Sequence, residues 1–152
     1  MAKILMVCLG NICRSPLAEG ILKAKINERG LSHIVDSAGT SSYHIGEPPD
    51  ERMIQTALKH GVDISIQRSR QFRVEDFDYF DNIYVMDSSN YKNVTRQCRN
   101  NRDREKVDHL LNAINPDMNQ PVPDPWYGGE EGFETVYSLV EEACEKIVSK
   151  IE

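Results

Sequence analysis

The stretch that decides the fold runs from Lys3 to Pro16 and reads KILMVCLGNICRSP. Its first part, up to Cys8, is a continuous apolar run of the kind that forms a strand buried on both faces of a sheet. A helix is predicted directly afterwards, because Ser15 suits the N-cap position and Pro16 the first helical position. A buried strand that leads into a helix through a short loop indicates an α/β fold, in which ligands bind at the carboxyl ends of the strands.

The rest of the chain repeats this alternation of strands and helices. Further strands are predicted at 33–37 and 82–86, and 106–110 favours a short strand within a segment, 106–114, that also suits a helix. Helices are predicted at 16–30, 49–61, 87–99 and 133–151, and their buried faces include Leu17, Ile21, Leu22 and Ala24 in the first and Met53, Ile54, Ala57 and Leu58 in the second. We therefore expect a parallel sheet with right-handed crossovers in a single domain spanning residues 1–152.

Composition limits the partners of the protein. The 152 residues carry 18 basic and 24 acidic side chains, a net charge of −6, which argues against nucleic-acid binding and against a polybasic membrane surface. Screening over about 8–10 Å weakens the distant acidic surface, so the net charge does not exclude a phosphate ligand. Four scattered cysteines and four scattered histidines show neither a disulfide framework nor zinc-ligand spacing, and the short N-terminal apolar run is no export signal. We expect a cytoplasmic protein without a metal or cofactor.

The loop after the first predicted strand carries the chemistry. Cys8 and Arg14 are separated by five residues between a strand and a helix, where backbone N–H groups and the helix N-terminus can form a cup for a dianion. Arg14 can bind two phosphate oxygens at once, and the positive surroundings favour the thiolate form of Cys8, which is the nucleophile. Gly10 permits close approach of the backbone, and Ser15 can donate a hydrogen bond to the sulfur.

The same spacing occurs a second time, from Cys98 to Arg104, without the same context. No buried strand precedes this copy, it contains no glycine, and no Ser-Pro helix start follows it. We interpret residues 98–104 as a solvated polar loop, because charged loops of this kind lie on the surface. The context of the first copy, and not its spacing, is what indicates a phosphate site.

Residues 7–16, VCLGNICRSP, resemble the signature loop of the low-molecular-weight protein tyrosine phosphatases, a family of cysteine-based acid phosphatases. Three further segments match in the family's order: 36–40 (DSAGT), 86–90 (MDSSN) and 124–128 (DPWYG). The resemblance implies a three-layer α/β fold, in which a four-stranded parallel sheet has helices on both faces and the phosphate-binding loop follows strand 1. It also implies a monomer that hydrolyses phosphotyrosine proteins or aryl phosphates and releases inorganic phosphate.

The same resemblance assigns roles to individual residues. Asp124 takes the position of the general acid, although an Asp before a proline is more often a plain turn residue. Cys8 and Arg14 are the remaining catalytic residues, and Trp126 and Tyr127 wall a cleft whose depth suits an aryl phosphate. The substrate contacts implied in full are Leu9, Gly10, Asn11, Ile12, Cys13, Ser15, Tyr43, Trp126 and Tyr127.

The resemblance further implies how the loop is supported and protected. Asn11, Ser15 and Ser37 match a hydrogen-bond network that holds the loop in a strained geometry. A histidine of that network aligns with about Ile66, so part of the support must differ in this chain. Cys13 matches a neighbour that forms a reversible disulfide with the nucleophile Cys8 and so protects it from deeper oxidation.

Three other functions are alternatives to an aryl phosphatase, and the residues of this chain argue against each of them. An arsenate reductase of the same fold would need further cysteines near residues 80–90, and this chain has none there. A protein-arginine phosphatase would carry threonine at the position of Ile12. A phosphotyrosine-binding module without activity would have lost Cys8, Arg14 or Asp124, and all three are present. We therefore favour a phosphatase that acts on aryl phosphates.

Overall fold

The computed structural model describes residues 1–125 and 128–152, and it is built around one parallel sheet of four strands. The strands are β1 (Lys3–Cys8), β2 (Ile34–Gly39), β3 (Asn82–Val85) and β4 (Val107–His109). Their order across the sheet is β2-β1-β3-β4, so the predicted loop-bearing strand is central and pairs in parallel with both β2 and β3. The four-stranded parallel sheet expected from the sequence is confirmed.

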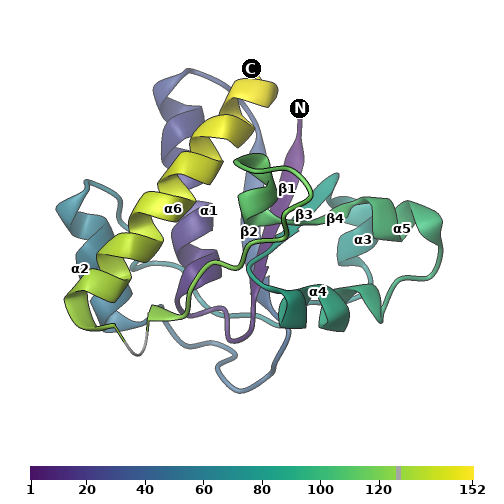
Figure 1. Cartoon of the computed structure of the whole chain (residues 1–152), viewed down its shortest axis with the longest axis horizontal. Helices are drawn as coiled ribbons and strands as arrows, with labels where there is room; N and C mark the ends of the chain where they lie inside the picture. Colours follow the sequence, from purple (N-terminus) through teal and green to yellow (C-terminus); the bar gives the residue numbers. More distant parts are fainter. Residues whose placement is uncertain (126–127) are drawn as a thin grey trace.

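Helices cover both faces of this sheet (Figure 1). They are α1 (Arg14–Glu28), α2 (Glu51–Lys59), α3 (Asp76–Tyr79), α4 (Ser88–Thr95), α5 (Asn101–Glu105), the 3₁₀ helix η1 (Leu110–Ala113) and α6 (Gly129–Lys150). In Figure 1, α1, α2 and α6 lie to one side of the sheet and α3, α4 and α5 to the other. This arrangement confirms the three-layer architecture.

The alternating side chains of β1 divide the core into two clusters. Ile4 and Met6 pack with the inner faces of α1, α2 and α6, whereas Leu5 and Val7 pack with Phe77 of α3 and residues around it. Successive side chains of a strand point to opposite faces, so a strand that is apolar at every position must be covered on both sides. The apolar run at the N-terminus is therefore what requires two helical layers.

The start of α1 differs from the prediction. The helix begins at Arg14 with Cys13 in the N-cap position, and no side chain caps it. Ser15, which was expected to cap the helix, lies inside its first turn, and its hydroxyl contacts the sulfur of Cys8. Pro16 is still tolerated, since the N–H groups of the first turn have no partner within the helix.

The remaining elements follow the pattern with small differences. Residues 106–114 resolve into the short strand β4 followed by η1, as the strand interpretation required. Gly30 and Gly61 follow the ends of α1 and α2 at φ values of +66° and +81°, which is typical of glycines that end helices. Leu58 was wrongly placed in the core: it is 46% exposed on the outer face of α2. None of the helices in the described residues is long and apolar enough to cross a membrane.

Candidate active site

The loop after β1 is held against the end of β2. The backbone N–H of Thr40 donates to the carbonyl of Cys8 (3.0 Å), and that of Ser41 donates to the carbonyl of Leu9 (2.9 Å). A Cβ atom at Gly39 would lie 2.8 Å from the carbonyl oxygen of Leu9, so only glycine permits this approach. Residues 36–40, which match a motif of the family in the sequence, thus pack against this loop.

The sulfur of Cys8 is buried and meets two polar groups. Cys8 is the last residue of the strand β1, and it is only 3% exposed. Its Sγ lies 3.0 Å from the Ser15 hydroxyl and accepts the backbone N–H of Asn11 at 3.3 Å. Asn11 has a φ of +56°, a left-handed conformation that is uncommon outside glycine. This residue thereby turns its N–H toward the sulfur.

A chain of buried hydrogen bonds extends from Asn11 away from the sulfur. The Asn11 side-chain amide donates to the hydroxyls of Ser15 (2.8 Å) and Ser37 (2.9 Å). Ser37 donates in turn to Glu19 (2.6 Å), a buried carboxylate paired with Lys23 at 2.5 Å. These contacts bring together the predicted network residues and add two that the sequence analysis did not identify.

The direction of these bonds follows from the chemistry of their last member. An ionised carboxylate only accepts, so Glu19 requires Ser37 to donate to it and to accept from Asn11. The Asn11 amide then uses both of its protons on the two hydroxyls. Because Ser15 accepts one of them, its own proton is available for the Cys8 sulfur. Through Ser37 and Asn11, Glu19 therefore orients the Ser15 hydroxyl so that it can donate to the Cys8 sulfur.

Arg14 is anchored by contacts from distant parts of the chain. Its Nη1 donates to Asp87 at 3.0 Å and to the carbonyl of Val122 at 2.9 Å. Asp87 is itself fixed as the N-cap of α4, where it accepts the N–H of Asn90 at 2.8 Å. Both contacts use one guanidinium nitrogen, which leaves Nε and Nη2 with donors for two oxygens of a dianion.

A cavity of about 120 Å³ opens above the sulfur. Its lining contains the three predicted catalytic residues, Cys8, Arg14 and Asp124, together with Leu9, Gly10, Ile12, Cys13, Ser41, Tyr43 and His44. Tyr43 is 82% exposed and forms part of the outer rim. Asn11 and Ser15, which were expected among the substrate contacts, are buried behind the loop and are absent from this lining. Trp126 and Tyr127 lie outside the described residues.

Two lining residues, Ser41 and His44, were missed by the sequence analysis. His44 packs against Gly10 and is held by Glu47, whose carboxylate lies 3.0 Å from Nδ1. Nothing in the sequence around a single histidine distinguishes this position, because its approach to the loop depends on the path of residues 40–47. The signal available was their position directly after a strand that neighbours β1.

The loop support near Ile66 does not use that residue, in line with the expected departure from the family's histidine. Ile66 is 85% exposed and takes no part in the network. Instead, the Ser69 hydroxyl donates to the carbonyl of Gly10 (3.0 Å), and the backbone N–H of Arg70 donates to the side-chain oxygen of Asn11 (3.0 Å). Gln67 reaches back to α1, where it donates to the carbonyl of Pro16 (3.0 Å). Backbone and serine donors from 67–70 thus hold the loop in place.

Cys13 shares the cavity with Cys8 but has a different environment. It is buried, and burial raises the pKa of its thiol well above the ordinary range, with the neighbouring Cys8 adding to the rise. Both cysteines are free thiols in this structure. Cys13 is therefore held protonated beside the candidate nucleophile.

Within the described part of the chain, no group of three or more His, Cys, Asp or Glu side chains could hold a metal ion.

Comparison with known proteins agrees with this geometry. The sequence model of the family described as low molecular weight phosphotyrosine protein phosphatase matches residues 3–152. A Synechocystis protein named as a low molecular weight protein-tyrosine-phosphatase is 45% identical over 151 residues, which are 98% of this chain and 96% of that protein.

Solved structures give the same result. A protein tyrosine phosphatase from Entamoeba histolytica superposes with a TM-score of 0.92 at 39% identity, covering 99% of this chain and 97% of that one. A Drosophila arginine phosphatase superposes with a TM-score of 0.90 at 32% identity, covering 99% and 98% of the two chains. The chain is thus a member of the low molecular weight phosphotyrosine protein phosphatase family and an enzyme with protein-tyrosine-phosphatase activity.

Proposed function

We propose that this enzyme hydrolyses phosphotyrosine in proteins, and small aryl phosphates, through a phosphocysteine intermediate on Cys8. One observation carries the proposal: Cys8, Arg14 and Asp124 line a single cavity, and the sulfur at its base meets two hydrogen-bonding groups, at 3.0 and 3.3 Å. A nucleophile, a bidentate cation and a carboxyl group at one site are the three components that the transfer of a phosphoryl group from an aryl oxygen needs.

In the first step, the Cys8 thiolate attacks phosphorus, and the sulfur–phosphorus bond forms as the bond to the tyrosine oxygen breaks. Asp124 gives its proton to that oxygen, which leaves as a neutral phenol. Arg14 binds two of the non-bridging oxygens through Nε and Nη2. Its contacts with Asp87 and Val122 position the guanidinium before the substrate arrives, so little reorganisation is needed during the reaction.

In the second step, Asp124 acts as a base. It takes a proton from a water molecule whose oxygen attacks phosphorus, the sulfur–phosphorus bond breaks, and inorganic phosphate is released. The departing thiolate is again stabilised by Ser15 and by the N–H of Asn11. The proposed steps therefore use only groups of this chain, the substrate and one water molecule, and they call for no metal or cofactor.

The rim of the cavity supports an aryl substrate. Leu9, Ile12 and Tyr43 provide apolar surface around the opening, while the sulfur lies at the base among buried groups. A phenyl phosphate is long enough to span this depth, whereas phosphoserine is too short. Phosphoarginine is the second candidate, favoured by the structural similarity to the Drosophila arginine phosphatase. Ile12 distinguishes the two, since the arginine phosphatases carry threonine there.

The acid role is tested by the dependence of the rate on the leaving group. Asp124→Ala should slow hydrolysis by about 10²–10⁴-fold for aryl phosphates with a basic leaving oxygen, and far less for those with an acidic one. Glu130→Ala, an exposed carboxylate at the start of α6, is the matched control and should leave all rates unchanged. An equal effect on every leaving group would exclude Asp124 as the acid.

The substrate is tested with phosphotyrosine, phosphoarginine and phosphoserine peptides of one sequence. We expect kcat/KM to be highest for phosphotyrosine, and preference for phosphoarginine would establish the second candidate instead.

The same reactions, repeated after peroxide treatment, test whether Cys8 and Cys13 form a reversible disulfide. Peptide mapping should find that bond, and finding only oxidised Cys8 would exclude it.

A further inference from the structure

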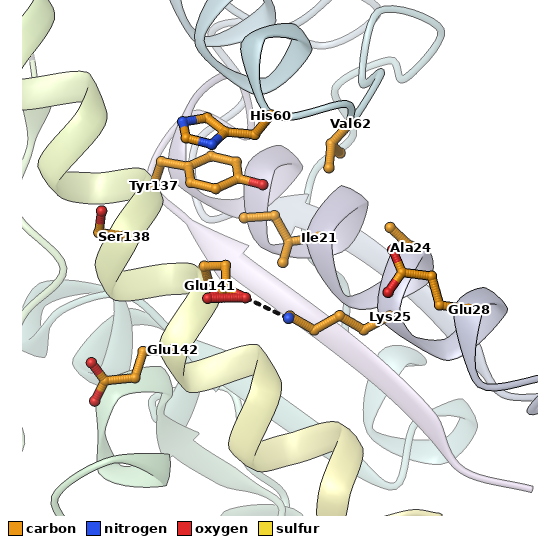
Figure 2. Close-up of a pocket in the computed structure, with 10 residues that line it drawn as sticks. All are labelled: Ile21, Ala24, Lys25, Glu28, His60, Val62, Tyr137, Ser138, Glu141 and Glu142. Atoms are coloured by element: carbon orange, nitrogen blue, oxygen red, sulfur yellow. Dashed lines mark ion pairs between the residues drawn. The ribbon is translucent and has the colours of Figure 1, made fainter.

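A second cavity lies far from the catalytic one, between α1, α6 and the end of α2 (Figure 2). Its volume is about 520 Å³, within the range of small-molecule sites. The lining consists of Ile21, Ala24, Lys25, Glu28, His60, Val62, Tyr137, Ser138, Glu141 and Glu142. It shares no residue with the lining of the catalytic cavity, so the proposed reaction gives this space no role.

One wall of this cavity presents a hydroxyl group without a partner. Tyr137 is only 7% exposed, and its ring stacks on that of His60 with centroids 3.9 Å apart. Figure 2 shows the Tyr137 hydroxyl directed toward the side of the cavity formed by Ile21 and Val62. Within residues 1–125 and 128–152, no group forms a hydrogen bond with this oxygen. The hydroxyl of a mostly buried tyrosine normally has a hydrogen-bond partner, so this one is available to a ligand.

The charges around the cavity are predominantly negative. Lys25 is already paired with Glu141 and lies 3.8 Å from Glu145. His60 is paired with Glu134 at 2.8 Å. Glu28 projects from α1 at the other end of the cavity, and no cation of the described residues pairs with it (Figure 2).

The phenol itself responds to these surroundings. Burial raises the pKa of Tyr137, and the carboxylates of Glu141 and Glu134 raise it further. The hydroxyl therefore stays protonated at neutral pH, and its oxygen lone pairs remain able to accept an N–H. A ligand that enters this cavity meets an acceptor at one end, a carboxylate at the other and apolar side chains between them.

We propose that this cavity binds an aliphatic polyamine. One nitrogen donates to the Tyr137 hydroxyl oxygen, a second forms an ion pair with Glu28, and the hydrocarbon between them lies along Ile21, Ala24 and Val62. A neutral apolar molecule would cover both polar groups without pairing them, and an anion would be repelled by the carboxylates. A polyamine satisfies both groups and covers the apolar surface between them.

The experiment is calorimetric titration of the whole protein with spermidine in 150 mM NaCl, with and without saturating inorganic phosphate. We expect saturable binding of one spermidine per chain that persists when phosphate occupies the catalytic cavity. The uncharged 1,5-pentanediol should not bind. Chemical shift changes on spermidine addition should centre on Tyr137 and His60. Absence of saturable binding, or binding abolished by phosphate, would overturn the proposal.

Three variants separate this site from general attraction to an acidic protein. Tyr137→Phe and Glu28→Gln should each weaken spermidine binding by about 5- to 10-fold, the effect of losing one hydrogen bond or ion pair. Glu105→Gln removes the same charge from the exposed surface of α5 and should leave the affinity unchanged. Equal weakening by Glu28→Gln and Glu105→Gln would show diffuse electrostatic binding and contradict the proposed site.

Discussion

The chain contains two segments in which a cysteine and an arginine are separated by five residues, and they have become different structures. Cys8 lies at the end of the central strand with its sulfur buried, and Arg14 is buried and anchored on Asp87. Cys98 follows α4 and is partly exposed, and Arg104 is exposed on α5. The spacing is identical, so what distinguishes the segments is the element that precedes each one.

One buried carboxylate lies beside the first segment and another lies within the second, and the two act differently. Glu19, beside the first segment, accepts from Ser37 and thereby orients hydroxyl groups that lead to the nucleophile. Asp103, within the second, accepts from the backbone and guanidinium of Arg99, which also binds Asp78. Residues 98–104 were expected to be a solvated loop. The structure instead shows a short helix, α5, tied to α3 by ion pairs.

The largest difference between the two segments should appear when their cysteines are exchanged for serine. Cys8→Ser should lower the turnover of phosphotyrosine on the order of 10⁶-fold, the scale seen when an enzyme loses its nucleophile. Cys98→Ser should retain the full rate, because that sulfur touches no part of the cavity. Rates measured with a phosphotyrosine peptide, and rapid-quench trapping of phosphate on Cys8, check both outcomes. Substantial turnover by Cys8→Ser would remove the proposed mechanism.

A smaller difference is expected for the arginines. Arg14→Lys keeps the positive charge but cannot bind two phosphate oxygens in a fork, so kcat should fall by about 10²–10³-fold. Arg104→Lys should change kcat by less than twofold, since Arg104 is exposed and its segment has no cavity. If Arg14→Lys retained most of its activity, charge alone would suffice and the anchoring by Asp87 would have no catalytic purpose.

The fold and the grouping of Cys8, Arg14 and Asp124 around one cavity could be predicted because their signals are local. A continuous apolar run requires a buried strand, and the loop that follows a buried parallel strand is where ligands bind. The resemblance then placed Asp124 at the same site, and the structure brings all three residues to one cavity. Each of these inferences needed only neighbouring residues or a motif.

The contacts that orient those residues were not predictable, because they join distant parts of the chain. Arg14 meets Asp87 and Val122, which follow it by 73 and 108 residues. Ser15 was assigned to the helix cap because the sequence shows its neighbours and not the sulfur above it. Glu19 reads as an ordinary polar residue of a helix until the fold places Ser37 beside it.

The third and smallest pair of variants compares the buried carboxylates. In Glu19→Gln the amide nitrogen must face either Lys23 or Ser37. If the nitrogen faces Lys23, it repels the ammonium group. If it faces Ser37, it reverses the hydrogen bond with that hydroxyl, so that Ser15 no longer donates to the sulfur. Activity should fall by up to about 100-fold, the cost of a small misplacement at a catalytic group, and Cys8 should be alkylated more slowly by iodoacetamide. An unchanged alkylation rate would limit Glu19 to a structural role.

Asp103→Asn should have the opposite profile, with lower stability and unchanged activity. The bonds from Arg99 hold the pKa of Asp103 below its usual value of 3.8. Between that value and the lower one in the fold, the unfolded chain binds a proton that the folded chain does not, so stability decreases as the pH falls. The variant lacks this contribution. The difference in unfolding free energy between the two proteins, measured in urea, should be full at pH 7 and shrink as the pH falls through the pKa of folded Asp103. A constant difference would mean that packing, and not the charge, accounts for the role of Asp103.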